Sequence, residues 1–169
     1  LALFEKSGLK LSTDNWQLST YHVGFIIGPR LNASGRLEHA IDSLRLLCTR
    51  DVARAYRLAS LLDETNSRRQ DETESSVKYA LAQFDPQNLP DLLFSYNPDY
   101  HQGIIGLIAS KLVEKYHRPA IVATFEGDQI KASARSVPGF HITDHIRSFM
   151  YLLENAGGHS MAAGFTAPA

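Results

Sequence analysis

Apolar residues in the first fifty positions fall into short segments that predict helices. Residues 1–7 have the pattern of a helix end that stops at Gly8. Residues 23–27 form a short apolar run, which predicts buried backbone. Apolar residues at helical spacing then predict a helix over residues 37–48 with one buried face. That stripe consists of Leu37, Ile41, Leu44 and Leu47 or Cys48.

The next stretch predicts one long helix over residues 51–84. Apolar residues recur at helical spacing at both of its ends, whereas residues 63–76 are almost wholly polar and contain no Pro or Gly. A single helix is therefore favoured over two helices joined by a polar loop. A helix that is polar all round in its middle is typical of a connection between two domains. Asp85-Pro86 ends it, and residues 86–90 are expected to be a linker.

From residue 91 the pattern changes to alternating strands and helices. The turn Gly127-Asp128 separates two strands of a predicted hairpin, and Gly157-Gly158 is expected to end the last helix. Strands are predicted over residues 92–96, 119–125, 129–135 and 161–165, and helices over residues 104–116 and 142–153. The expected fold class is α/β, with a helical segment first and a mixed sheet after the long helix.

Composition places the chain among ordinary globular proteins. Of its 169 residues 44% are hydrophobic and 21% charged, and the formal net charge is −1. Any contact with nucleic acid must then come from local clusters of basic residues, because no bulk positive field exists. The single cysteine, Cys48, is interpreted as a buried apolar residue, and its lack of a partner fits a reducing, cytoplasmic location. No stretch approaches the length of a membrane span. Because the chain begins with Leu1, we expect a piece of a longer protein.

The first candidate site is the segment of residues 28–37. Gly28-Pro29 predicts a break, and Asn32 and Ser34 are candidate caps of the helix that follows. A helix N-terminus has unpaired N–H groups and partial positive charge, and Arg30 and Arg36 would add fork-shaped donors suited to phosphate. The same residues also fit an ordinary capped turn with two solvated arginines.

Two candidate anion sites follow in the second half. His101 and Gly103 stand immediately before a helix, where N–H groups could meet a phosphate; a loop whose glycine only permits close packing is the alternative. Arg135 and Ser136 stand at the end of a strand and suit a phosphate or a sugar edge. An edge-strand salt bridge is the alternative for Arg135.

The third candidate in the second half is the run Gly157-Gly158-His159. The glycines permit close approach of a ligand to the backbone, and His159 can donate to an oxyanion or move a proton. A helix C-cap followed by a surface histidine is the alternative. His141 and His145, four residues apart, could share a helix face as metal ligands, but no third ligand stands at a recognisable spacing. No metal site is therefore predicted.

Several of these motifs, taken in order, resemble the RecJ exonuclease family within the DHH phosphoesterases. The resemblance rests on residues 23–37, 62–70, 101–112, 116–122, 133–141 and 157–164. It implies a C-terminal remnant of a DHH domain over residues 1–50, a connecting helix over 51–84 and a DHHA1 nucleic-acid-binding domain over 85–169. The family shows glycines where this chain has Ala132 and Ala134, which affects how closely a backbone can approach there.

The resemblance also implies a function. The parent enzyme would hydrolyse single-stranded DNA from its 5′ end, using Mn²⁺ or Mg²⁺ held by a DHH domain whose Asp-His-His triplet this chain lacks. The chain alone is therefore expected to bind no metal, to contain no catalytic residue and to be inactive. Its expected partners are single-stranded DNA and the missing DHH and OB domains, with no membrane. A nano-RNase or nucleotide phosphatase, and a non-catalytic DHHA1 module, are the alternatives.

Site residues carried over from the family lie in both halves. Arg30, Asn32 and Arg36 would line one wall of a cleft, and Arg135, Ser136 and His159, with His159 in a supporting role, would hold phosphate on the other. His101, Gly103, Gly157 and Gly158 complete the expected nucleic-acid contacts. Without the rest of a DHH domain, the apolar run at residues 23–27 and the stripe from Leu37 are expected to be exposed or covered by self-association.

Overall fold

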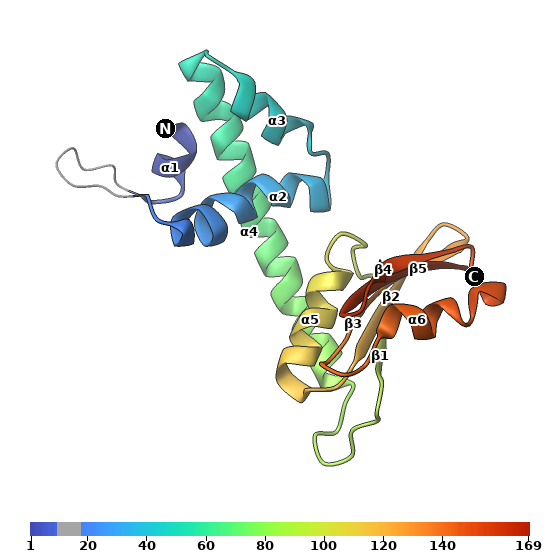
Figure 1. Cartoon of the computed structure of the whole chain (residues 1–169). Coiled ribbons are helices and arrows are strands. Elements are labelled where there is room, and N and C mark those ends of the chain that lie inside the picture. The colour runs from blue at the N-terminus through green and yellow to red at the C-terminus, as the bar shows by residue number, and fades with distance from the viewer. Residues whose placement is uncertain (10–17) are drawn as a thin grey trace. The chain divides into compact units, whose positions relative to one another are not determined.

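The computed structural model describes residues 1–9 and 18–169 (Figure 1). The described chain divides into two compact units, Leu1–Asp71 and Glu72–Ala169. One helix, α4 (Val52–Ala82), belongs to both units and is continuous, as the sequence predicts. The first unit is helical and the second is an α/β domain, so the expected α/β class is confirmed.

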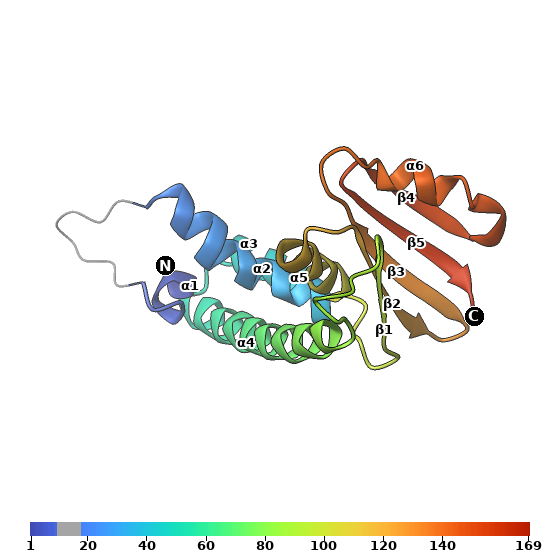
Figure 2. The same cartoon turned by 90° about the horizontal axis from the view of Figure 1, so that it is seen from below.

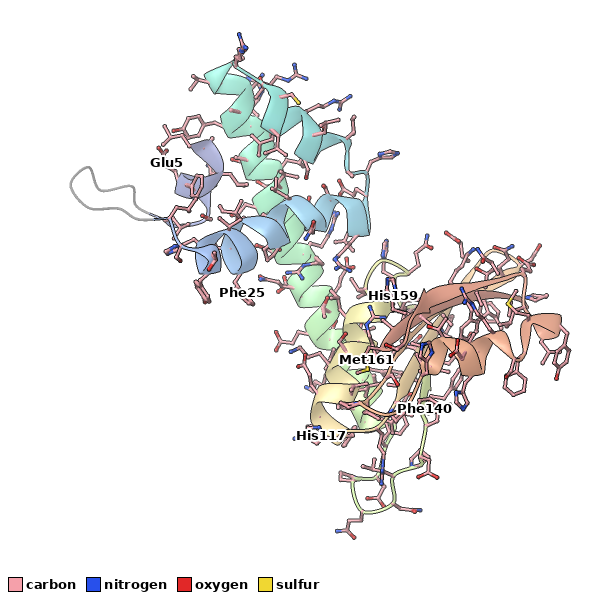
Figure 3. The ribbon with its side chains drawn as sticks, in the orientation of Figure 1. Glu5, Phe25, His117, Phe140, His159 and Met161 are labelled. Carbon is pink, nitrogen blue, oxygen red and sulfur yellow. The ribbon has the colours of Figure 1, made fainter. Side chains whose placement is uncertain are left out.

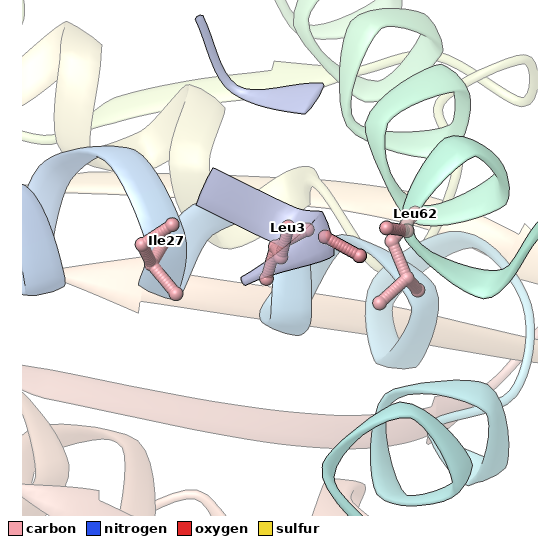
Figure 4. Close-up of a cluster of buried hydrophobic side chains, with 5 residues drawn as sticks. Leu3, Ile27 and Leu62 are labelled. Carbon is pink, nitrogen blue, oxygen red and sulfur yellow. The ribbon is translucent and has the colours of Figure 1, made fainter. Parts of the chain in front are cut away.

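The first unit packs its helices around a small apolar core. Its elements before α4 are α1 (Ala2–Lys6), the π-helix η1 (His22–Ile27), α2 (Gly28–Leu37) and α3 (Ile41–Cys48). Figure 4 shows the cluster in which α1, η1 and α4 meet. Its buried members are Ala2, Leu3, Ile27, Ala59 and Leu62.

The predicted break at Gly28-Pro29 is wrong. Gly28 has helical φ and ψ, so η1 runs directly into α2. Pro29 has no N–H and crowds the preceding turn, which ordinarily kinks a helix. Here the preceding turn widens instead, and the Gly28 N–H donates five residues back, to the carbonyl of Val23. Asn32 and Ser34 consequently lie inside α2 and cap no helix.

The predicted helix over residues 37–48 is also corrected. Leu37 ends α2, and α3 begins only at Ile41. The helix turns Ser43 and Leu46 toward the unit's interior, so the expected stripe faces outward, with Leu47 68% exposed. Cys48 is exposed and not buried.

The apolar run at residues 23–27 is largely exposed as well. Only Ile27 is buried, and Phe25, 72% exposed, points away from the unit in Figure 3. The expectation of buried backbone here is wrong, whereas the expectation of exposed apolar surface on this unit is confirmed.

The middle of α4 is not exposed to solvent on every side. Thr65 and Asn66 are buried, one turn beyond the buried Ala59 and Leu62. The buried face of the helix therefore continues into the segment that the sequence marks as polar.

The second unit is built on a five-stranded mixed sheet in the order β1-β2-β3-β5-β4. β1 and β2 are parallel, as expected of strands joined by a helical crossover, and the other neighbours are antiparallel. The strands are β1 (Leu93–Tyr96), β2 (Ala120–Glu126), β3 (Gln129–Arg135), β4 (Asn155–His159) and β5 (Ala162–Pro168). The helices are α5 (Ile105–Tyr116), α6 (Ile142–Arg147) and the 3₁₀ turn η2 (Met150–Leu152).

The helices α5 and α6 cover opposite faces of this sheet (Figure 2). α6 packs with Ile142 and Ile146 on Ala134 and Ala163. Ser133 and Arg135 alternate with Ala134 along β3, so they belong to the other face, where they meet Gly106 of α5.

The last predicted helix is too long. α6 ends at Arg147, and after η2 the chain becomes extended at Leu153. Gly157 and Gly158 do not end a helix but lie inside β4, because residues 155–159 pair with β5. Strand pairing therefore overrides the local signal of two adjacent glycines.

Candidate nucleic-acid interface

Strand register brings several of the predicted residues to the α5 side of the sheet. Arg135 of β3 is paired with Ala162 of β5, which is paired in turn with His159 of β4. In the next row of the same face Ser133 is paired with Gly164, and Gly164 with Gly157. We call these residues the open sheet face: Ser133, Arg135, Gly157, His159 and Gly164. His159 and Gly164 are exposed, and Figure 3 shows His159 at the edge of the sheet.

Arg135 is held in place by neighbours on two elements. Its Nη1 donates to the Ser133 hydroxyl at 3.1 Å and to the Ala134 carbonyl at 2.8 Å. Its Nη2 lies over Gly106 in the first turn of α5, 2.8 Å from where a Cβ on that residue would be. The guanidinium is therefore positioned before any ligand arrives, which lowers the entropy cost of binding an anion.

The two glycines of β4 have different roles. No described atom outside its neighbours lies within 4 Å of a Cβ built on Gly157, and the nearest atom at Gly164 is 3.6 Å away. Gly157 of β4 and Gly164 of β5 therefore leave a strip of backbone without side chains, which a ligand can approach closely. Gly158 instead has φ +151°, and a Cβ there would collide with the Ala162 carbonyl. Its role is to let β4 and β5 pair.

Ser136 lies beneath the surface. It is 4% exposed, and its hydroxyl donates to the Phe140 carbonyl at 2.6 Å while its N–H donates to the Met161 carbonyl at 2.9 Å. These bonds close the turn that follows β3. Ser133, the other hydroxyl beside Arg135, is the one that contacts the guanidinium.

His101 and Gly103 form a local cap. The Gly103 N–H donates to Nδ1 of His101 at 3.0 Å, and the Ile104 N–H donates to the His101 carbonyl. The Gly103 N–H expected to meet a phosphate is thus already donated within the loop. Because Nδ1 accepts, the ring proton is on Nε2.

In the first unit the predicted arginines lie along α4. Nε of Arg30 is 2.7 Å from Oδ1 of Asp63, and its Nη1 donates to the Ile26 carbonyl. Asn32 is exposed, and Arg36 is half-buried beside Arg69 of α4. Burial lowers the pKa of Arg69 from its usual value, and the charge of Arg36 lowers it further.

Arg69 was not among the candidates from the sequence. Its Nη2 donates to Oδ1 of the buried Asn66 at 2.9 Å. The signal that could have revealed it is the Asn66…Arg69 spacing, which places an amide and a guanidinium on one helix face.

The two histidines at the start of α6, His141 before the helix and His145 within it, are engaged locally. Nδ1 of His141 is 3.0 Å from Oδ2 of Asp144, and Nδ1 of His145 contacts the His141 carbonyl. Within residues 1–9 and 18–169, no three His, Cys, Asp or Glu side chains are grouped so that they could hold a metal ion.

Known proteins resemble this chain over most of its length. The family model of the DHHA1 domain matches residues 89–169, the segment that contains the whole sheet. The single-stranded-DNA-specific exonuclease RecJ of Salmonella typhimurium is 36% identical over 95% of the chain, and that of Bacillus subtilis is 36% identical over 85%. Residues 89–169 match the DHHA1 domain, and the chain is similar to one part of RecJ.

Solved RecJ structures share the fold. The RecJ of Thermus thermophilus in complex with Mg²⁺ matches 99% of the chain with a TM-score of 0.83 and 33% identity. An exonuclease RecJ bound to manganese matches with a TM-score of 0.81 and 34% identity. The chain covers 25% and 40% of those two proteins, and 30% of the Salmonella RecJ.

None of the helices in the described part of the chain is long and apolar enough to cross a membrane.

Proposed function

We propose that this chain is the strand-positioning part of a single-stranded-DNA-specific 5′–3′ exonuclease and that it binds the strand through the open sheet face. The observation that carries the proposal is the pre-positioned guanidinium of Arg135. Two parallel N–H donors of a guanidinium match two oxygens of a phosphate. The adjacent strip at Gly157 and Gly164 lets a sugar–phosphate backbone lie close to the sheet.

The chemistry of this face suits binding without sequence preference. Contacts to phosphate and sugar fix the register of a strand but do not read its bases. His159 adds a ring N–H donor at the edge of the same face. An exonuclease that digests any single strand needs such positioning groups.

The arginines of the first unit are proposed as a second anion site. Arg36 and Arg69 place two positive charges together; burial lowers the pKa of Arg69, and the charge of Arg36 lowers it further. A bound phosphate would offset both costs. In this proposal Asn32 contributes an exposed amide, and Arg30 orients α2 through Asp63.

Catalysis itself is assigned to the longer protein. RecJ structures are known with Mg²⁺ and with Mn²⁺, and such ions activate water and stabilise developing charge during phosphodiester hydrolysis. In this proposal the chain contributes positioning, and the metal ligands belong to the DHH domain of the longer protein. The proposed partners are single-stranded DNA and the DHH and OB domains of the same protein, in the cytoplasm.

The direct test is binding of a fluorescein-labelled dT₁₂ strand to the 169-residue chain, measured by anisotropy at several salt concentrations. Arg135→Ala should weaken binding about tenfold. It should also reduce the steepness of the plot of log binding constant against log salt concentration by about one. Arg147→Ala is the matched control, because Arg147 is exposed on α6 across the sheet. Equal effects of the two substitutions would contradict the proposal.

A second measurement separates positioning from catalysis. The chain is incubated with Mn²⁺ and 5′-labelled single-stranded DNA, and products are resolved by gel. We expect no digestion, and robust processive digestion would show that catalysis does not depend on the longer protein.

A further inference from the structure

A cavity of about 290 Å³ lies between α4 and the loop that joins β1 to α5, within the second unit. α4 contributes Glu72 and Tyr79, and the loop contributes Asp99, Tyr100, His101 and Ile104. The cavity follows the C-terminal end of β1, the end of parallel strands where α/β sheets bind ligands. Its volume is sufficient for one nucleobase and not for a folded segment.

One wall of the cavity is aromatic and fixed. Tyr100 is 4% exposed, and its hydroxyl contacts the Ser95 hydroxyl at 3.0 Å. The rings of Tyr79 and Tyr100 meet edge to face, with centroids 6.1 Å apart. Tyr79 is thereby held in place although it is 52% exposed. An exposed, supported ring of this kind is a stacking surface for a base.

The polar groups of the cavity favour a ligand rich in hydrogen-bond donors. Asp99 and Glu72 bring carboxylate acceptors from the loop and from α4. The N–H of Asp99 donates to the Asn97 side chain at 2.9 Å, which fixes the loop backbone. His101 accepts through Nδ1 from Gly103, so its Nε2–H is the donor that this ring offers a ligand. Two carboxylates repel a phosphate, so a strand would place its base here and its phosphate elsewhere.

We propose that this cavity binds a nucleobase of the single strand and prefers guanine. The Watson–Crick edge of guanine presents two adjacent N–H donors that one carboxylate can accept together, and a neighbouring oxygen that can accept from an imidazole N–H. Thymine has one donor between two acceptors, so it matches the carboxylates poorly. Base contact of this kind adds a preference that phosphate contacts do not provide.

The cavity and Arg135 adjoin the same turn of α5. Ile104 lines the cavity, and Gly106, two residues later, contacts the guanidinium. In this inference the base in the cavity and the phosphate at Arg135 belong to one bound strand. This inference rests on the proposed function, because it assigns a base site to the same strand.

The experiment compares dT₁₂ with dT₁₂ strands that carry a single dG at each position in turn, bound to the 169-residue chain. One placement of dG should strengthen binding about fivefold or more. Tyr79→Ala and Asp99→Asn should each abolish that preference, and Tyr79→Phe should keep it because the ring remains. Tyr151→Ala, which removes an exposed tyrosine of η2, is the control and should change nothing.

The readout is the ratio of dG to dT affinities, because Asp99→Asn also removes a charge that repels every strand. Arg135→Ala should weaken all strands and leave the ratio unchanged. Titration of guanosine 5′-monophosphate, followed by NMR at Tyr79 and His101, tests the cavity apart from strand binding. If the NMR resonances shift with the guanosine nucleotide and not with the thymidine nucleotide, the cavity binds guanine even if dT₁₂ does not bind. A flat dG series or equal shifts with both nucleotides would overturn it.

Discussion

The guanidinium of Arg135 lies against Gly106, the second residue of α5, so closely that any side chain at that position would touch it. The contact joins the end of β3 to the start of a helix that lies between β1 and β2 in the chain. A glycine at this point therefore serves a distant arginine and not the local turn.

Gly106→Ala should weaken binding of dT₁₂ about fivefold while leaving the fold intact. The new Cβ would lie 2.8 Å from Nη2 of Arg135, a flexible side-chain end that can move aside. Alanine also favours the helix by up to about 1 kcal/mol, so stability should not fall. Binding and thermal unfolding are measured together, with Gly24→Ala as the control because its surroundings are open. A variant that binds as well as wild type would mean that Arg135 needs no fixed position.

Gly158→Ala should destabilise the chain by at least about 2 kcal/mol, whereas Gly157→Ala should not. Gly158 has φ +151° and no room for a Cβ, and its neighbour has open space. Urea unfolding of the two variants gives the comparison. Gly157→Ala should nevertheless weaken DNA binding, since its methyl group projects from the bare strip. Similar stability of both variants would contradict the assigned roles.

Asp63→Ala should cost about 1–2 kcal/mol of unfolding free energy. It removes the carboxylate 2.7 Å from Arg30, whose side chain is only 18% exposed. Asp42→Ala breaks a more exposed ion pair with Arg45 and should cost about 0–1 kcal/mol. Chemical denaturation distinguishes the two, and equal small losses would show that Arg30 does not depend on Asp63.

Tyr100 predicts an alkaline limit to stability. Burial, helped by Tyr79, raises the pKa of this phenol from 10.0 against the opposing effect of the Ser95 hydrogen bond. The unfolded chain therefore ionises first, and the stability from this group is complete below pH 10.0 and lost as pH rises through the folded pKa. The free energy of unfolding of wild type should exceed that of Tyr100→Phe at neutral pH, and this difference should shrink between about pH 9 and about pH 12. If urea unfolding shows the same pH dependence of the unfolding free energy for both proteins, the prediction is contradicted.

The exposed apolar surface of the first unit predicts self-association. Phe25 stacks on Tyr21, with ring centroids 5.2 Å apart, and both rings are exposed. Sedimentation velocity should show a mass that rises with protein concentration, and Phe25→Glu should reduce that rise. Tyr151→Glu serves as the comparison on the second unit. A monomer at every concentration would count against the prediction.

Long periodic features of this chain were predictable, and features that depend on tertiary partners were not. The uninterrupted helical spacing of residues 51–84 and the apolar run at residues 119–125 predict α4 and β2, because each period is set by local geometry. The order of motifs also predicted an arginine on the sheet. The order of motifs does not predict that Arg135 packs on Gly106. That contact forms only when α5 lies across β3.

Local rules failed where packing offered a better solution. Gly157-Gly158 is a common helix stop, but pairing with β5 satisfies more backbone groups in an extended conformation. Sequence pattern does not predict the environment of Arg69, because Arg36 comes from α2, far away in the chain. Helical spacing predicts that Leu44 and Leu47 are buried, but spacing alone does not determine which stripe of a short helix packs inward, and both are exposed.

The widened turn of η1 sets the direction in which the side chains of α2 point around the helix axis. An i→i−5 turn holds one residue more than an α-turn, and one residue corresponds to about 100° of rotation. Arg30 and Arg36 follow this turn in the chain, so the rotational position of both depends on it. Deleting a single residue from His22–Ile27 would therefore turn both guanidiniums off α4 without changing either arginine, so the length of this turn is as much a part of the site as its charges.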